Sequence, residues 1–335
     1  MHSLPDGYSE QTMTIEDVPR LTRFVNRLAR RWIERDVISE DRLRLTVSVP
    51  GIDLAESARL IFAANDVLAA AGFVFHRDPH VTVHGWGLVD VPHQGLGIGR
   101  WLHDWILTRS RDALQMATAD ARVVVRQTSF NGDAASDAFL VNAGYTRTRH
   151  YWRMLIELTE PPATPEWPDG IALDTFDPER DLRAIVRASR DAFQDHYGFV
   201  AGSFEQELER TRHRIEGDPG FDPSLQYLAE DGGEIAGLCF CSPNEAGDDT
   251  TGYVQSLGVR PAWRRRGIAR ALLLHAFGQF HQRGTRAVSL HVDAQSLTGA
   301  TRLYESVGMR VDELTHEYEL ELRSGVDMTA KEPAN

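Results

Sequence analysis

Two short stretches of this 335-residue chain repeat one pattern that could hold a phosphate. The first is QGLGIG at residues 94–99, and the second is RRRGIA at residues 264–269. Each lies between a strand-like segment and a pattern of apolar residues typical of a helix. The first turn of a helix presents main-chain N–H groups without intrahelical partners, together with partial positive charge. We therefore predict two anion sites, best matched to phosphate or pyrophosphate.

Glycine and arginine have separate uses in such a loop. Gly97 and Gly267 lack a Cβ, which lets a phosphate approach the main chain. Arginines in the second stretch would add charge-assisted donors. The predicted contacts are Arg264, Arg265, Arg266, Gly267, Ile268, Ala269 and Arg270 in the second loop, and Gln94, Gly95, Leu96, Gly97, Ile98, Gly99 and Arg100 in the first.

Charge argues against a nucleic-acid surface. The chain has 36 Lys and Arg against 49 Asp and Glu, a net charge of −13, so its field repels polyanions. The dinucleotide pattern G-x-G-x-x-G and the Gly-Lys-Ser/Thr of the Walker motif are both absent. A basic loop on an acidic chain therefore predicts one small anionic ligand, with neither nucleic acid nor membrane as partner. The oligomeric state cannot be read from these features.

The two loops belong to a longer internal repeat. Gly97 aligns with Gly267 at an offset of 170, and Gly144 aligns with Gly308 at an offset of 164. Four prolines in Glu160–Gly170 indicate a linker. We expect domains at 1–159 and 171–323, a linker at 160–170 and a frayed tail at 324–335. Each domain should be one α/β unit with two early helices, a hairpin, then strand, loop, helix, strand, helix and strand.

The second half shows that order most clearly. Its predicted strands cover 170–177, 251–259, 286–292 and 315–322, with a hairpin turning at 231–233. Its predicted helices cover 177–193, 203–215, 268–284 and 298–308. In the first half, a strand pair should turn at Asn65-Asp66.

These motifs, with ATRLYESVGM at 300–309, resemble the GNAT superfamily of N-acetyltransferases. The doubled plan is similar to that of the mycothiol synthase group. The resemblance implies acetyl-CoA as cofactor and, in each half, a mixed, mostly antiparallel sheet flanked by helices. It implies that each loop holds the cofactor pyrophosphate and that the strand before it offers main-chain groups to the pantetheine arm. Those groups would belong to Leu257 and Val259, and to Leu88 and Val89. Ser296 or Thr298 stands where the family often has a cofactor-binding asparagine.

Acyl transfer to an amine needs an oxyanion donor and an acid for the leaving thiolate. The resemblance assigns the acid to Tyr304, and we assign the donor to the main-chain N–H of Leu257. The position aligned with Tyr304 in the first half is Leu140, which cannot donate a proton. We therefore expect chemistry in the second half and a first half that is not catalytic.

The base that accepts the amine proton is not evident. Mycothiol synthases carry a glutamate on the strand before the loop, where this chain has Tyr253, with Gln255 two residues on. Asp248 and Asp249 could act through water, although a solvated turn also explains them. Asp195, His196 and Tyr197, at the end of a predicted helix, are candidate substrate contacts, as are Tyr253 and Gln255.

Two functions fit this sequence. The first is an acetyl-CoA-dependent N-acetyltransferase that acylates the primary amine of a small metabolite. The second is a CoA-binding regulatory or scaffold protein with degenerate catalytic machinery. No metal site is predicted, and Cys239 and Cys241 should be buried, unpaired thiols. An apolar run of membrane-spanning length and a signal peptide are both missing, so we expect a cytoplasmic protein.

Overall fold

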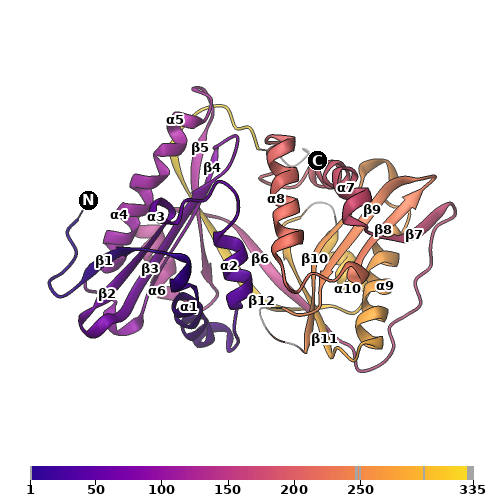
Figure 1. The fold of residues 1–335 in the computed structure, drawn as a ribbon, viewed down its shortest axis with the longest axis horizontal. Coiled ribbons are helices and arrows are strands. Elements are labelled where there is room, and N and C mark those ends of the chain that lie inside the picture. The colour runs from indigo at the N-terminus through magenta and orange to yellow at the C-terminus, as the bar shows by residue number, and fades with distance from the viewer. Residues whose placement is uncertain (1, 246–247, 249, 297–298, 330–335) are drawn as a thin grey trace. The chain divides into compact units, whose positions relative to one another are not determined.

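The computed structural model describes residues 2–245, 248, 250–296 and 299–329, and these fold into two compact units (Figure 1). The first unit comprises the chain up to Arg149 together with Thr315–Met328, and the second comprises His150–Leu314. This division differs from the successive domains expected from the proline-rich segment. The reason is that the final strand of each half completes the sheet of the other unit.

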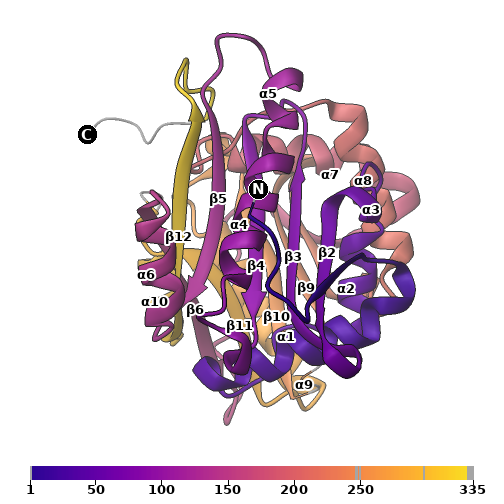
Figure 2. The same ribbon diagram turned by 90° about the vertical axis from the view of Figure 1, so that its left-hand side faces the viewer.

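The first unit has the sheet order β1-β2-β3-β4-β5-β12 (Figure 2). Among its described strand pairs, β4 and β5 are parallel and the others are antiparallel. Its strands are β1 (Ser9–Thr12), β2 (Ala58–Ala63), β3 (Val67–His76), β4 (Thr82–Val89), β5 (Val123–Phe130) and the end of β12 (Arg310–Arg323). Its helices are α1 (Val18–Ile33), α2 (Glu40–Val47), α3 (Leu54–Ser57), α4 (Ile98–Ser110), α5 (Asp112–Met116) and α6 (Ala134–Asn142).

Helices cover both faces of this sheet. Alternate strand residues point to opposite faces. Phe73 on β3 packs in one core with Leu21 and Phe24 of α1. The neighbouring Gly72 faces the other way, where a Cβ would lie 3.0 Å from Leu102 of α4. Helices α1 and α2 therefore cover one face, and α4 covers the other.

The second unit has the sheet order β6-β11-β10-β9-β8-β7. Its described pairs are again antiparallel, except that β10 and β11 are parallel. Its strands are β7 (Ile171–Thr175), β8 (Gln226–Asp231), β9 (Glu234–Ser242), β10 (Thr251–Val259), β11 (Ala287–Asp293) and most of β6 (Thr146–Glu157). Its helices are α7 (Pro178–Phe193), α8 (Phe204–Gly217), α9 (Ile268–Gln282) and α10 (Ala300–Ser306).

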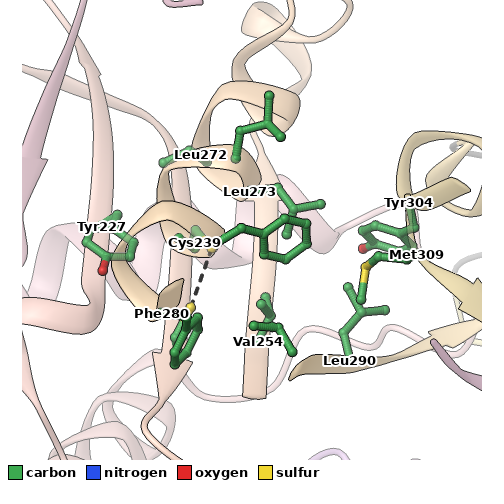
Figure 3. Close-up of a cluster of buried hydrophobic side chains, with 14 of the residues drawn as sticks. Tyr227, Cys239, Val254, Leu272, Leu273, Phe280, Leu290, Tyr304 and Met309 are labelled. Carbon is green, nitrogen blue, oxygen red and sulfur yellow. Dashed lines mark hydrogen bonds between the residues drawn. The ribbon is translucent and has the colours of Figure 1, made fainter. Parts of the chain in front are cut away.

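Both faces of the second sheet are also covered. Ile185 and Ala188 of α7 pack with Leu228 and Leu238 on one face. On the other face, α9 and α10 form the larger core, in which Phe280 is fully buried (Figure 3). Burying a side chain of this size contributes roughly 1.5–3 kcal/mol. The mixed, mostly antiparallel sheet flanked by helices is thus confirmed in both units.

Local sequence signals account for the element ends. Asp177 caps α7 by accepting hydrogen bonds from the N–H groups of Glu179 and Arg180, and Ser203 caps α8 through Gln206 N–H. The predicted hairpin turns where Asp231 pairs with Glu234. Cys239 and Cys241 are confirmed as free, buried thiols.

The tail expected to be frayed is partly docked in the first unit. Val326 N–H donates to Asp120 O at 2.7 Å, and Val326 O accepts from Arg122 N–H at 2.9 Å. The described residues 324–329 form no helix or strand beyond this bridge. Main-chain hydrogen bonds of this kind leave no pattern in the sequence, which explains the difference.

Candidate active site

Two diverging strands form the centre of the candidate site in the second unit. Strands β10 and β11 pair only from Thr251–Tyr253 to Ala287–Ser289 in the described chain. Beyond Tyr253, β10 continues for six residues and carries a bulge between Val254 and Ser256. A bulge bends a strand and increases its twist. Leu257 and Val259, predicted to contact the cofactor through their main chain, both lie beyond the point of divergence.

The first unit diverges in the same way. Strands β4 and β5 pair from Thr82–His84 to Val124–Arg126 and no further among the described residues. Leu88 and Val89 therefore lie in the first unit where Gly258 and Val259 lie in the second. The repeat inferred from sequence is thus a repeat of backbone geometry.

The two predicted anion loops have matching conformations. Gly97 and Gly267 both have φ +91° and precede the first residues of α4 and α9. Gly95 (φ +75°) and Arg265 (φ +61°) are left-handed as well. Left-handed residues in a turn can point successive N–H groups toward one point, which is an anion-binding arrangement. This geometry fits the phosphates of coenzyme A without requiring the arginine side chains.

The side chain of Gln94 in the first loop, and of Arg264 in the second, hydrogen-bonds its loop to the strand before it. Gln94 Nε2 donates to Val89 O at 3.2 Å, and Arg264 Nε donates to Val259 O at 3.1 Å. Arg264 also pairs with Asp195, with Nη2–Oδ1 at 2.9 Å. The hydrogen bond from Arg264 lowers the pKa of Asp195. Two candidate site residues thus bind each other and brace the loop.

The remaining arginines of the second loop divide into two kinds. Arg266 pairs with Asp231 at 3.1 Å and donates to Asp169 O at 3.0 Å. Arg264 and Arg266 thus both have a carboxylate partner within the chain, and their contact with an anion stays a prediction. Arg265 and Arg270 are exposed. The anion-binding prediction therefore rests on the main chain, with charge supplied by Arg265 and Arg270.

Tyr304 lies in the large core of the second unit, beside Leu290 and Met309 (Figure 3). Its side chain is 8% exposed, and burial raises the pKa of its phenol above the usual 10. The phenol is therefore protonated at neutral pH, as a general acid must be. Leu140, at the aligned position of α6, is equally buried and offers no proton.

A polar pair that sequence reasoning missed lies on the face of the second sheet opposite to the core that contains Tyr304. Tyr253 Oη is 3.3 Å from His291 Nδ1, and the ring centroids are 5.8 Å apart. His291 is exposed and lies two residues beyond Ser289, where β10 and β11 diverge. On β6, Arg153 is paired with His291 across the strands. The sequence separates Tyr253 from His291 by 38 residues, so only strand register reveals their contact.

A buried ionic cluster lies beneath that pair. Arg153 Nη2 is 2.6 Å from Glu245 Oε2, which also accepts from Ser289 Oγ at 2.6 Å. Arg153 also pairs with Asp312. Buried charges persist in proteins when they are paired in this way. We assign this cluster to structure, because each of its charged groups has a partner of opposite sign within the cluster.

Other candidate residues have more local surroundings. His196 packs edge-on against Phe193 at 4.8 Å, and burial lowers the pKa of its imidazole, which favours the neutral form. Tyr197 is half-buried, and Gln255 lies within the bulge. Asp248 accepts from Thr250 N–H at 2.9 Å, which fits a turn. Ser296 follows the end of β11, whereas Asp249 and Thr298 lie outside the described residues.

Comparisons with known proteins agree with this fold. The family described as "Acetyltransferase (GNAT) family" matches residues 190–309. A mycothiol acetyltransferase of Thermobispora bispora is 38% identical over 182 residues, 53% of this chain and 60% of that protein. One from Salinispora arenicola is 30% identical over 283 residues, 76% of this chain and 89% of that protein. The match to the Thermobispora relative thus spans less than two thirds of its length.

Solved structures extend the likeness to the whole chain. A GCN5-related N-acetyltransferase from Sphaerobacter thermophilus is 33% identical with a TM-score of 0.79, covering 97% of this chain and 99% of that one. A tandem GNAT protein from the clavulanic acid biosynthesis pathway, 14% identical, shares the fold at a TM-score of 0.72, with 95% of this chain and all of that one covered. Fold and loops define a tandem GNAT protein. The chain belongs to the GNAT family of acetyltransferases, and acetyl-CoA, the expected cofactor, is the cofactor of that family.

Within the described ranges, no cluster of three or more His, Cys, Asp or Glu side chains is arranged to hold a metal ion. In the same ranges, none of the helices has the length and apolar character needed to cross a bilayer.

Proposed function

We propose that the protein is an acetyl-CoA-dependent N-acetyltransferase of a small primary amine and that the second unit performs the transfer. The observation that carries this proposal is the combination, in that unit, of the left-handed loop at Gly267 with the buried, protonated Tyr304. The first unit has the loop but carries Leu140 in place of the phenol. Relatives named mycothiol acetyltransferase and GCN5-related N-acetyltransferase support the same reaction class.

The residues of the second unit would share the work as follows. N–H groups at the start of α9, including those of Ile268 and Ala269, bind the pyrophosphate of the cofactor. Coenzyme A supplies an activated acyl thioester. The N–H of Leu257 stabilises the negative charge that develops on the acyl oxygen. Tyr304 donates its proton to the departing thiolate.

We propose His291 as the base, because its contact with Tyr253 places it beside the position that holds a glutamate in mycothiol synthases. The amine nitrogen bonds to the acyl carbon as the C–S bond breaks, and the amine proton moves to His291. Other charged or titratable groups near His291 are Tyr253 on β10, Arg153 on β6 and Asp293 on its own strand. His196, electrostatically coupled to Asp293, extends this polar face toward the end of α7.

The amine acceptor would bind on this polar face. We also propose that the protein is located in the cytoplasm. The relatives' names suggest a small-molecule amine, but Tyr253 departs from the glutamate of mycothiol synthases. We therefore propose the reaction class without assigning mycothiol biosynthesis.

The testing experiment is an amine-dependent thiol-release assay with acetyl-CoA over a panel of amino sugars, polyamines and aminoacyl compounds. We expect turnover of at least one amine by the wild-type protein and by Gly97→Asp, but loss of turnover in Gly267→Asp. Turnover that survives Gly267→Asp and disappears in Gly97→Asp would place the chemistry in the first unit. Binding of acetyl-CoA without turnover of any amine would favour the regulatory or scaffold function.

A further inference from the structure

The first unit contains a cavity of about 490 Å³ that the proposed transfer reaction does not use. Residues from α1, α2, β4, β5, α4 and α6 line it. It extends from the loop before α4 to the helices that cover the opposite side of the sheet. The first unit carries Leu140 where the second unit carries the phenol of Tyr304, so the ligand of this cavity must be inferred from the lining itself.

One end of the cavity is suited to a phosphate ester. Gln94, Gly95 and Gly99 line it, and they belong to the loop whose left-handed glycines match the second loop. Val89, at the end of the diverging strand, lines it as well. Leu96, Gly97, Ile98 and Arg100, predicted in the same loop, do not contribute to the lining. This end has the form that the family uses for coenzyme A.

The other end is apolar. Side chains from α1 and α2 enclose it, with Leu21, Val25, Leu28, Leu43 and Val47 among them. The charged group that these two helices contribute to the lining is Arg31, and no carboxylate from either helix lines the cavity. An ammonium group would meet a positive charge there and no counter-ion. An alkyl chain would instead bury apolar surface, which favours binding.

The single carboxylate in the lining is already committed. Asp133 accepts from Ser136 N–H at 3.1 Å and from Ser136 Oγ at 2.6 Å, so it caps α6. It lies at the start of α6. An amine acceptor is therefore a poor match for this cavity.

An independent observation points to a ligand with a polar group. His103 lines the cavity and is 8% exposed, and its Nε2 has no hydrogen-bond partner among the described residues. Burial lowers the pKa of this imidazole, which keeps it neutral. Buried polar atoms normally have partners. The amide and thioester groups of an acyl-pantetheine arm would offer one.

We propose that the first unit binds a coenzyme A thioester whose acyl chain is longer than acetyl. The chain lies between α1 and α2, and the unit holds the thioester without transferring its acyl group. This inference goes beyond the proposed transferase activity, because it gives the other unit a ligand of its own. It depends on the loop geometry, the apolar end and His103, and not on which amine the second unit acylates.

The test is calorimetric titration of the full chain carrying Gly267→Asp, a substitution that should prevent the second loop from binding the cofactor. The probes are CoA, acetyl-CoA and octanoyl-CoA, the last kept below its micelle concentration. Each buried methylene favours binding by about fourfold, so octanoyl-CoA should bind at least about tenfold more tightly than acetyl-CoA. Adding Val25→Phe, or Thr46→Phe at an exposed position of α2, should bring that ratio close to one while leaving CoA affinity unchanged.

Controls make each outcome decisive. Arg23→Phe adds the same ring to an exposed position of α1 outside the lining and should preserve the ratio. Gly97→Asp should abolish binding of all three probes. Equal affinities for acetyl-CoA and octanoyl-CoA in the Gly267→Asp protein without a cavity-filling Phe would overturn the proposal. Octanoyl-CoA binding that survives Gly97→Asp would also overturn it. Since the amine assay reports on the second unit, its failure would leave this titration interpretable.

Discussion

Tyr304 and Leu140 occupy one backbone position in two copies of the same helix end. Tyr304 O accepts from Met309 N–H at 3.0 Å, and Leu140 O accepts from Tyr145 N–H at 3.0 Å. The glycine that precedes each donor residue is left-handed in both copies, with φ +94° at Gly308 and +92° at Gly144. The two units therefore differ in a side chain at a shared position, and of the two side chains only the phenol of Tyr304 has a proton to donate.

Replacing Tyr304 by Phe should lower turnover roughly 10²-fold or more, the usual contribution of a general acid. Acetyl-CoA affinity should change little, because packing is preserved. Since burial raises the phenol pKa above 10, wild-type turnover should show no loss from Tyr304 ionisation up to pH 10. A pH–rate profile of both proteins provides the measurement.

Tyr227→Phe is the matched control for that substitution. Tyr227 lies in the same core, and its Oη is buried without a hydrogen-bond partner among the described residues. Its loss should leave turnover unchanged. Equal slowing by both substitutions would mean that Tyr304 acts through packing and not as the acid.

His291→Gln should reduce turnover roughly 10²-fold, because Gln cannot accept the amine proton. The wild-type rate should fall on acidification as the imidazole becomes protonated, and this dependence should vanish in the variant. Tyr253→Phe should have a smaller effect, since it removes the hydroxyl of the 3.3 Å contact and leaves His291 in place. His275→Gln, on α9 and away from β11, should keep the wild-type profile; a persistent acid limb in His291→Gln would exclude His291 as the base.

Gly267 permits separate tests of backbone strain and of charge. A Cβ at Gly267 would meet nothing within 4 Å, so Gly267→Ala should lower the free energy of unfolding only by the left-handed penalty, about 1–2 kcal/mol. Gly267→Asp adds a carboxylate at the predicted pyrophosphate site and should also abolish acetyl-CoA stabilisation of the second unit. Thermal unfolding with and without acetyl-CoA measures both. Normal cofactor response in Gly267→Asp would remove the loop from the site.

The sequence predicted the elements and loops well because their signals are local. Caps at Asp177 and Ser203, and the glycines of the two loops, act within a few residues. Exchange of β6 and β12 escaped prediction, because pairing partners far apart in sequence leave no local pattern. The contact of Tyr253 with His291 depends on register between strands in the same way.

Side-chain assignments were less predictable than main-chain ones. Arg264 and Asp195 each have a residue type suited to ligand binding, yet they bind each other across 69 residues. Composition cannot distinguish a guanidinium that awaits a phosphate from one that already has a carboxylate. The left-handed conformation at Gly267, in contrast, follows from residue type and its place before a helix.

Asp195→Asn tests whether this carboxylate braces the loop or binds the amine. If it braces the loop, the variant should unfold at lower temperature and show a raised KM for acetyl-CoA with an unchanged KM for the amine. Arg264 lowers the folded-state pKa of Asp195. The stabilisation should therefore be complete above the unfolded-state pKa of about 3.9 and be lost as pH falls through the lower folded-state value.

Unfolding of wild type and Asp195→Asn followed between pH 2 and 7 measures this dependence. The difference in stability should be constant near neutrality and shrink below about pH 4. A raised KM for the amine alone would show that Asp195 contacts the acceptor after all.

Gly258 should be required where α7 approaches β10. A Cβ there would lie 3.0 Å from Ala192 Cβ and from the ring of Phe193, so the end of α7 would have to move. Overpacking of this kind typically costs about 1–3 kcal/mol. Because His196 follows that helix end, Gly258→Ala should also raise the KM for the amine.

Gly278→Ala is the matched control, since its Cβ meets nothing within 4 Å inside α9. It should stabilise the protein by up to about 1 kcal/mol through helix propensity. Chemical denaturation and steady-state kinetics of the two variants measure both effects, and equal stability of the two would show that α7 does not depend on this close approach.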